Sequence, residues 1–381
     1  MGDPFRQMAL QIIVYEQTGS SAALAGLATV LALPALVLGP IAGVLVDRWD
    51  RRAVMLVSQV ARAALVTLLV LSPTLPMVYA ISIATASIAA FYMPARNAIL
   101  PTIVGSDEVL RANSFSMTTG TLLLMAAPAL AAIVIGWLGA TAALGVNAAA
   151  FALAAVAVFF IRTRPGPRAA DPVPAGAQAA WWREMLEGAR FVQRSPLIRG
   201  ILVIFAIQTI GFAVLPVLQV VLVTQGLGLP AHHLGYLMAV FAVGMLAGGL
   251  AMPWVGRLVR TTRLVTVMSI AYGVFFLLLA ITDSLGLVYV WLVAMGVCEA
   301  AISVAVPSAL QRIVPDELRG RVFSVQNTVM TLMLVIGMAI AGVAAETLPV
   351  RTVFAAGAAV CVVGGLTGFW LFAGVGNEES A

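Results

Sequence analysis

The stretch RLVTVMSIAYGVFFLLLAIT, residues 263–282, has 20 residues and a single charge, on Arg263 at its first position. A helix of this length, rising about 1.5 Å per residue, matches the ~30 Å hydrocarbon core of a bilayer. Because that core holds no water, backbone amides and carbonyls must pair within the segment, which favours a helix over an open strand. The stretch therefore predicts a membrane-spanning helix.

Similar segments recur along the whole chain. Of its 381 residues, 62% are hydrophobic and 10% charged, whereas soluble domains carry about 25% charged residues. A window of about 19 residues finds twelve apolar segments, at 4–17, 21–46, 53–72, 76–96, 112–136, 140–161, 197–224, 231–256, 263–282, 285–310, 320–345 and 349–373. We predict an all-α membrane protein with twelve transmembrane helices, the first of them incomplete.

The two halves of the chain share a sequence pattern. A shift of 209 residues aligns five identical pairs, Gly2 with Gly211, Gly26 with Gly235, Gly39 with Gly248, Arg48 with Arg257 and Arg51 with Arg260. The pattern predicts two six-helix pseudo-repeats, residues 1–161 and 197–381. Parallel repeats of this kind are typical of alternating-access transporters, whose substrate site lies between the halves at mid-membrane.

The same alignment bears on the first helix. Met1 aligns with Ile210, and the seventh segment has about 13 residues before that position. We expect the first helix to lack roughly its cytoplasmic half because the true start lies upstream. Truncation of the chain is the alternative.

Arginine sets the expected orientation, because basic residues are retained on the cytoplasmic side of short loops. Arginines crowd the loops after the second, fourth, sixth, eighth and tenth segments, whereas the opposite loops contain only Arg351. We therefore expect a multi-pass protein of the cell inner (plasma) membrane with both termini in the cytoplasm.

The long central loop, residues 162–196, is expected to be a cytoplasmic linker. Its first part, RTRPGPRAADPVPAGAQAA, is rich in proline, glycine and alanine, as flexible linkers are. Its second part, WWREMLEGARFVQR at 181–194, separates apolar from charged residues as an amphipathic helix at a membrane surface does.

Several function classes are excluded by the composition. The chain has no lysine, so it lacks the residue with which a Walker A loop reaches nucleotide phosphates, and direct ATP-driven pumping is not expected. The arginines lie in short loops rather than on one face, which argues against nucleic acid as a partner. No catalytic constellation or metal-ligand spacing is present, so we predict no enzymatic activity, no cofactor and no metal. We expect a monomer whose partners are the bilayer, a small-molecule substrate and protons.

The segment GVLVDRWDRR at 43–52 resembles the signature loop between helices 2 and 3 of the major facilitator superfamily. GDPFRQMALQIIVYEQTGS at 2–20, PAR at 94–96 and SPLIRG at 195–200 resemble the branch that contains macrolide efflux proteins and the enterobactin exporter. The resemblance covers nearly the whole chain and implies a secondary transporter of the efflux type, associated with drug resistance.

The resemblance also implies a cytoplasmic gate. In this family the signature loop acts as a latch, in which an aspartate lies near a helix end and arginines bind carboxylates or helix C-termini. Asp47, Arg48, Arg51 and Arg52 fit these roles, and Arg257 aligns with Arg48 in the second half. The alternative is that these arginines only set the topology.

Antiporters of the family carry a glycine-rich motif with proline in helix 5. The comparable stretch here, AAPALAAIVIG at 126–136, has alanines where glycines are usual. Small residues still permit close helix packing. The departure weakens the inference of antiport without removing it.

Ionisable residues inside the membrane are functional candidates, because hydrocarbon disfavours charge. Glu299 lies in the middle of an apolar segment with no arginine one turn away. Hydrocarbon favours its protonated form, the property that a proton-coupling carboxylate needs. A glutamic acid that only hydrogen-bonds between helices, or that faces the cytoplasmic gate, is the alternative.

Two more charged candidates lie three residues apart on the first helix. Asp3 and Arg6 can share a face, and they either line the cavity or simply pair. Arg62 lies about two turns inside the third segment, from which its side chain can reach the cytoplasmic surface. We therefore favour a gating or structural ion pair for Arg62 over substrate binding.

Three uncharged polar residues complete the predicted site: Gln11, Gln208 and Asn327. Each can contact substrate or can serve only as a hydrogen bond between helices. Our leading hypothesis is a proton-driven exporter of hydrophobic or amphipathic compounds. The alternatives are a siderophore or lysolipid carrier of the same fold and a non-transporting membrane sensor or remnant.

Overall fold

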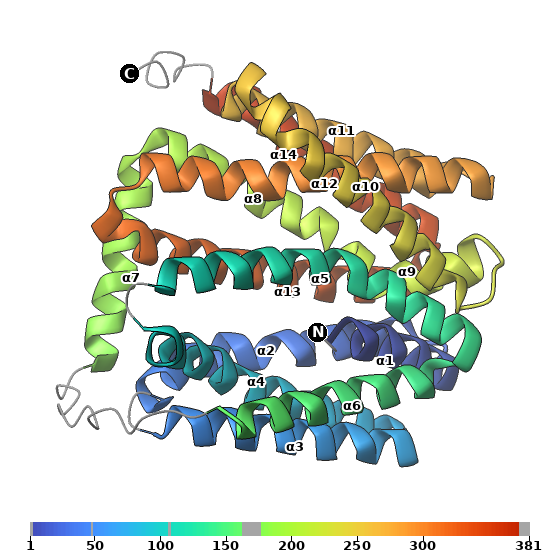
Figure 1. Ribbon diagram of the computed structural model, residues 1–381. Coiled ribbons are helices and arrows are strands. Elements are labelled where there is room, and N and C mark those ends of the chain that lie inside the picture. The colour runs from blue at the N-terminus through green and yellow to red at the C-terminus, as the bar shows by residue number, and fades with distance from the viewer. Residues whose placement is uncertain (1–2, 47–48, 106–107, 162–176, 373–381) are drawn as a thin grey trace. The chain divides into compact units, whose positions relative to one another are not determined.

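The computed structural model describes residues 3–46, 49–105, 108–161 and 177–372, and the only regular structure in these ranges is helical (Figure 1). This confirms the all-α prediction. Asp47 and Arg48 lie outside the described residues, as does most of the predicted linker.

Ten helical segments in the described ranges are long and apolar enough to cross a bilayer. They are Ser21–Gly39, Arg51–Leu71, Leu75–Val104, Ala140–Phe159, Pro196–Gly226, His233–Met252, Thr261–Ile281, Leu285–Ile313, Leu318–Thr347 and Val350–Leu371. The other two predicted segments correspond to α1, Asp3–Thr18, and α5, Val109–Leu138. With 16 residues, α1 is ~24 Å long, less than the hydrocarbon thickness. The count of twelve therefore stays a prediction.

The helices group into two compact units. Unit 1 lies within residues 1–19 and 29–181, and unit 2 within 20–28 and 182–381. Unit 1 contains α1, most of α2 (Ser21–Val46), α3 (Arg51–Leu71), α4 (Leu75–Val104), α5 and α6 (Ala140–Phe159). In this unit α3 packs against α4 and α6, and α1 packs against α5 and α6. The predicted domain limits at residues 161 and 197 stay a prediction.

Local sequence explains where α3 begins and which face it buries. The Asp50 side chain accepts hydrogen bonds from the backbone N–H groups of Arg52 and Ala53, which satisfies two amides that a helix start leaves free. Gln59, Arg62 and Val66 are buried at spacings of three and four, so they share one face of the helix. Two of these three buried side chains are polar, which is unusual for a face turned into a helical bundle.

Unit 2 contains the remaining helices, apart from residues 177–181 at the start of α7, which belong to unit 1. They are α7 (Ala177–Arg194), α8 (Pro196–Phe212), α9 (Val214–Val221), the π-helical turn η2 (Leu222–Gly226), α10 (His233–Leu258), α11 (Thr261–Ile281), α12 (Leu285–Ile313), α13 (Asp316–Thr347) and α14 (Val350–Phe372). Here α10 packs against α12, α11 packs against α12 and α14, and α14 packs against α8. The predicted segment 197–224 corresponds to α8, α9 and η2 in succession.

Two glycines bring α10 and α12 into backbone contact. A Cβ atom on Gly244 would lie 2.2 Å from the carbonyl oxygen of Val293, and one on Gly296 would lie 2.3 Å from that of Phe241. No side chain fits at either position, so glycine is required for this helix approach. Glu299 follows Gly296 by three residues, which is about one helical turn. The close approach of α10 and α12 therefore fixes the position of the helix segment that carries Glu299.

The predicted amphipathic helix at 181–194 is present as part of α7. Val192 is buried in the apolar core of unit 2, and Glu187 forms an ion pair with Arg321 at 2.5 Å. Leu186 is 52% exposed. The side chains of residues 181–185 lie outside the described set, and attachment to the membrane surface stays a prediction.

Candidate functional site

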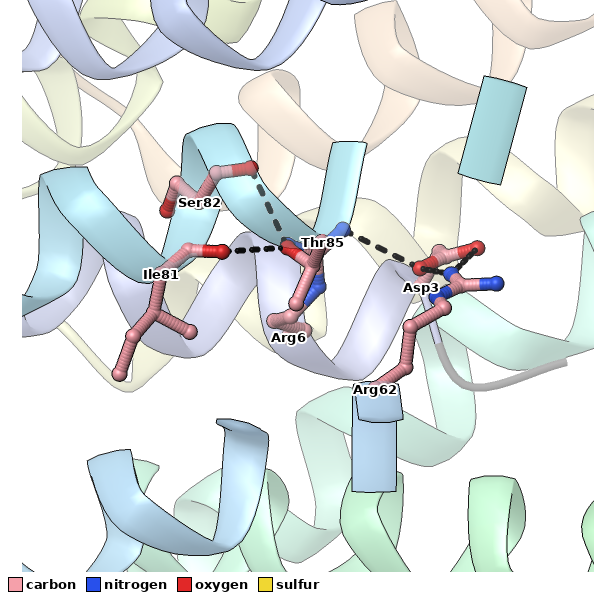
Figure 2. A network of polar contacts seen from close by, with 6 residues as sticks. All are labelled: Asp3, Arg6, Arg62, Ile81, Ser82 and Thr85. Atoms are coloured by element: carbon pink, nitrogen blue, oxygen red, sulfur yellow. Dashed lines mark hydrogen bonds and ion pairs between the residues drawn. The ribbon is translucent and has the colours of Figure 1, made fainter. Parts of the chain in front are cut away.

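Unit 1 encloses a charged cluster built on Asp3 (Figure 2). Arg62 of α3 donates from Nη2 to both carboxylate oxygens of Asp3, at 2.9 and 3.2 Å. Arg6 donates from Nη2 to Oδ1 of Asp3 at 3.2 Å, and from Nη1 to the Thr85 hydroxyl of α4 at 2.7 Å. The Asp3 carboxylate therefore joins α1 to α3, and the Arg6 guanidinium extends the cluster to α4.

The expected Asp3–Arg6 contact is thus present, and Arg62 joins it. Arg6 is 7% exposed and Arg62 4% exposed, so the Arg62 side chain does not extend to the protein surface. The Arg62 guanidinium also lies 4.0 Å from the centroid of the Phe151 ring of α6, a cation–π contact. Two buried cations share one half-exposed carboxylate, which leaves the cluster with surplus positive charge.

Further polar side chains are buried in unit 1. They are Gln11 of α1, Gln59 of α3, Ser82 of α4 and Asn147 of α6. Neither amide atom of Asn147 has a hydrogen-bond partner among the described residues. Sequence reasoning missed Gln59, Ser82 and Thr85. The spacing of three between Gln59 and Arg62, and between Ser82 and Thr85, is a signal that would have found them.

Unit 2 contains a cavity of about 250 Å³. Its wall includes Phe205, Gln208 and Phe212 of α8, Tyr272 of α11, Glu299 of α12 and Met330 of α13. The structure therefore brings together Gln208 and Glu299, which sequence analysis had singled out separately. Asn327 of α13 is exposed and does not line this cavity.

The polar groups on the cavity wall differ in how they are satisfied. Ser269 of α11 donates to Oε1 of Gln208 at 2.8 Å. The Nε2 atom of Gln208 and the hydroxyl of Tyr272 are buried without a hydrogen-bond partner among the described residues. Within the same residues Glu299 takes part in none of the ion pairs and none of the hydrogen bonds, and no arginine lines the cavity. Two donors and one carboxyl group are thus available to a ligand.

Part of the predicted cytoplasmic gate is described. Arg52 of α3 donates to the backbone carbonyls of Val158 and Phe159 at the end of α6, and lies 5.8 Å from the Phe159 ring centroid. Arg51 donates to the carbonyl of Ala98 in α4 at 3.4 Å. A cation at a helix C-terminus complements the negative end of the helix dipole. The side chain of Arg257, like Asp47 and Arg48, lies outside the described residues.

In unit 2, two arginines near the end of α12 also donate to backbone carbonyls. The sequence analysis had interpreted these arginines only as a topology signal. Arg319 donates to the carbonyls of Gln311 and Val314, and Arg312 donates to the carbonyl of Ser308 and to the hydroxyl of Thr261. Arg319 thereby satisfies carbonyls that the end of α12 leaves free, whereas Arg312 joins α12 to the start of α11 through Thr261.

The long apolar helices, with charged groups buried in unit 1 and a carboxyl group lining the cavity of unit 2, define a multi-pass α-helical membrane protein. The family model of the Major Facilitator Superfamily matches residues 7–271 and 212–380, and the chain belongs to that superfamily. It is accordingly a transporter and not an enzyme.

Curated relatives match most of the chain. It is 29% identical over 343 residues to the MFS-type transporter YfiS of Bacillus subtilis (strain 168), covering 85% of this chain and 78% of that protein. It is 26% identical over 362 residues to macrolide efflux protein A of Streptococcus pyogenes, covering 91% and 86%. The predicted resemblance to macrolide efflux proteins is confirmed.

Solved structures of transporters share the fold. The nucleoside transporter NupG superposes with a TM-score of 0.74 at 13% identity, over 97% of each chain. A bacterial homologue of the iron transporter ferroportin, in an inward-facing state, superposes with a TM-score of 0.71 at 16% identity, over 99% of this chain and 95% of that one. At such identities the likeness establishes the fold alone.

Proposed function

We propose that this chain is a secondary active transporter that exports hydrophobic or amphipathic small molecules in exchange for protons, by alternating access. Similarity to macrolide efflux protein A over most of both chains supports the direction of transport. The absence of lysine, and with it of a Walker A loop, supports a gradient rather than ATP as the energy source.

The observation that carries the proposal is Glu299. Its carboxyl group lines a cavity with aromatic and aliphatic walls and has no ion-pair partner among the described residues. A carboxylate in such surroundings is costly unless it is neutralised. Glu299 therefore takes up a proton when the cavity opens to the outside and releases it when the cavity opens to the cytoplasm, while substrate moves in the opposite direction.

The remaining predicted residues take supporting roles in this proposal. Asp3, Arg6 and Gln11 form the polar interior of the N-terminal half, 1–161, and Gln208 contacts substrate in the C-terminal half, 197–381. Arg51, Arg52 and Arg62, with Asp47, Arg48 and Arg257, hold the cytoplasmic side closed. The contacts of Arg51 and Arg52 with carbonyls of neighbouring helices support the gate. The proposal takes both termini to lie in the cytoplasm.

Purified protein in liposomes with an imposed pH gradient tests the proposal. Radiolabelled erythromycin, a macrolide, is the probe, and protein-free liposomes correct for passive accumulation of this weak base. We expect gradient-driven flux in the wild type that an uncoupler abolishes. Glu299→Gln is expected to reduce this flux to background while leaving downhill exchange without a gradient measurable.

Glu16→Gln is the matched control, because Glu16 is an exposed glutamate of α1. It is expected to transport as the wild type does. Gradient-driven flux that persists unchanged in Glu299→Gln contradicts the coupling role and leaves transport intact. A wild type that moves no substrate under any gradient contradicts the whole proposal and favours a non-transporting remnant.

A further inference from the structure

The cavity of unit 2 has a chemical character that narrows the class of substrate. Its polar groups are the Glu299 carboxyl, the Gln208 amide nitrogen and the Tyr272 hydroxyl. The two threonines on its wall are already engaged, since the hydroxyls of Thr209 and Thr331 donate to the carbonyls of Phe205 and Asn327 in their own helices. A ligand therefore meets one acidic group and two hydrogen-bond donors.

The acidic group selects for positive charge. None of the arginines whose side chains are described lines the cavity, so an anionic ligand would meet Glu299 without compensation, whereas a protonated amine would supply the missing counter-charge. Aromatic rings of Phe205, Phe212 and Tyr272 stand on the same wall, and ring faces attract cations.

The two donors select for an oxygen atom. Gln208 is 4% exposed and Tyr272 is fully buried, yet Nε2 of Gln208 and the hydroxyl of Tyr272 have no partner among the described residues. A buried donor without an acceptor is costly, so its pairing with a ligand oxygen is favourable. The Ser269 hydroxyl donates to Oε1 of Gln208, which leaves the Nε2 end of the amide for the cavity.

Size limits how much of a ligand enters. The cavity volume of about 250 Å³ is below the range of roughly 300–1,000 Å³ that holds whole drug-sized ligands. It therefore accommodates one end of a larger molecule.

We propose that this cavity binds the amine-bearing end of the transported substrate, with Glu299 as counter-charge and with Gln208 and Tyr272 donating to an oxygen atom near the amine. This proposal rests on the proposed transport function and names its substrate class, amphipathic organic amines that carry a hydroxyl, ether or carbonyl group close to the nitrogen.

A matched pair of fluorescent probes tests the charge requirement. Monodansylcadaverine carries a free amine, and its N-acetyl derivative has the same aromatic body without the charge. Both are titrated against the full chain in detergent at neutral pH. We expect the wild type to bind the amine more tightly by about tenfold or more, as charge-assisted hydrogen bonds allow. Glu299→Gln is expected to bind both probes equally.

Two measurements keep this test decisive if a variant folds poorly. The N-acetyl probe should bind Glu299→Gln with wild-type affinity, which reports an intact cavity, and Glu16→Gln should keep the full preference for the amine. A preference that survives in Glu299→Gln overturns the proposal, as does a wild type that binds the two probes equally or binds the amine without saturation.

A pair of competitors tests the oxygen requirement. 2-Amino-1-phenylethanol and 2-phenylethylamine differ by one hydroxyl group, and each displaces monodansylcadaverine in the same titration. We expect the hydroxylated amine to compete better by roughly threefold to tenfold in the wild type, the effect of one or two neutral hydrogen bonds. Tyr272→Phe and Gln208→Leu should each reduce this ratio, and an unchanged ratio in both variants overturns the assignment of the donors.

These binding assays need no gradient, so they fail independently of transport. Amine selectivity that depends on Glu299, in a protein that moves no substrate, would support the site and contradict the transport proposal. Gradient-driven transport without amine selectivity would support the transport proposal and contradict the proposed amine site.

Discussion

The two helical units treat buried charge in opposite ways. In unit 1 the cations of Arg6 and Arg62 share the carboxylate of Asp3, and Arg62 also stacks on Phe151. In unit 2 the carboxyl group of Glu299 lines a cavity without a counter-charge among the described residues. A paired charge stabilises the helices that it joins, whereas an unpaired one is available to a proton or a ligand. In the mechanism that we propose, the first cluster stabilises the helices of unit 1 and the second carries the exchange of proton and substrate.

Removing the shared carboxylate should give the largest effect on stability. Asp3→Asn leaves two buried arginines without an anion, and we expect the free energy of unfolding to fall by about 3 kcal/mol. Denaturant titration in detergent micelles measures this change. The matched control is Asp283→Asn, because Asp283 is 86% exposed, lies between two apolar segments and pairs with Arg351 at the start of α14. That substitution should cost less than about 1 kcal/mol, and equal losses would mean that the unit 1 cluster is not specially stabilised.

Substitution of Phe151, whose ring lies against the Arg62 guanidinium, is expected to have the next largest effect on stability. Phe151→Leu removes the cation–π contact and some packing volume, and we expect a loss of about 2 kcal/mol in the free energy of unfolding. A double-mutant cycle with Arg62→Met separates the two contributions, with an expected coupling of about 1 kcal/mol. A coupling near zero would show that Arg62 depends on Asp3 alone.

Glu299→Gln should have little effect on folding. Because the carboxyl group has no ionic partner among the described residues, the free energy of unfolding is expected to stay within about 0.5 kcal/mol of the wild type or to rise slightly. The same denaturant titration measures it. A loss above about 2 kcal/mol would reveal a structural partner for Glu299 and erase the contrast between the units.

Ser269 is expected to have a small effect on stability and a second effect on ligand preference. Ser269→Ala removes the hydrogen bond to Gln208, and the free energy of unfolding should fall by about 0.5 kcal/mol. If Ser269 orients the amide, the preference for the hydroxylated competitor should also fall by about threefold. Ser269→Thr, which keeps a hydroxyl, should restore that preference. A purely structural role would lower stability and leave the preference unchanged.

Much of the candidate site could be predicted where the signal is local. Asp3 and Arg6 are three residues apart, so helix geometry alone brings them to one face. Glu299 stands out because it interrupts an apolar segment with a charge. Tyr272 was missed, although its spacing of three from Ser269 and its hydroxyl within an apolar run are the kind of signal that indicates a polar partner.

Other features depend on helix rotation and could not be predicted. Arg62 meets Asp3 across 59 positions of sequence, and Ser269 meets Gln208 across 61. Asn327 was expected at the site, but residues 330 and 331 of the same helix line the cavity instead. A turn of 3.6 residues places polar groups on every face of a helix as long as α13, and composition does not reveal which face turns inward.

The sequence by itself determined that this protein consists of membrane helices, because a lipid environment requires each apolar segment to satisfy its own backbone hydrogen bonds. It also determined which residues are costly to bury. Only the tertiary structure decided that Asp3 is shared by two arginines while Glu299, Gln208 and Tyr272 face a common cavity. The reason is physical: the cost of burying a charge is a property of the residue, whereas its compensation depends on which helix faces pack together.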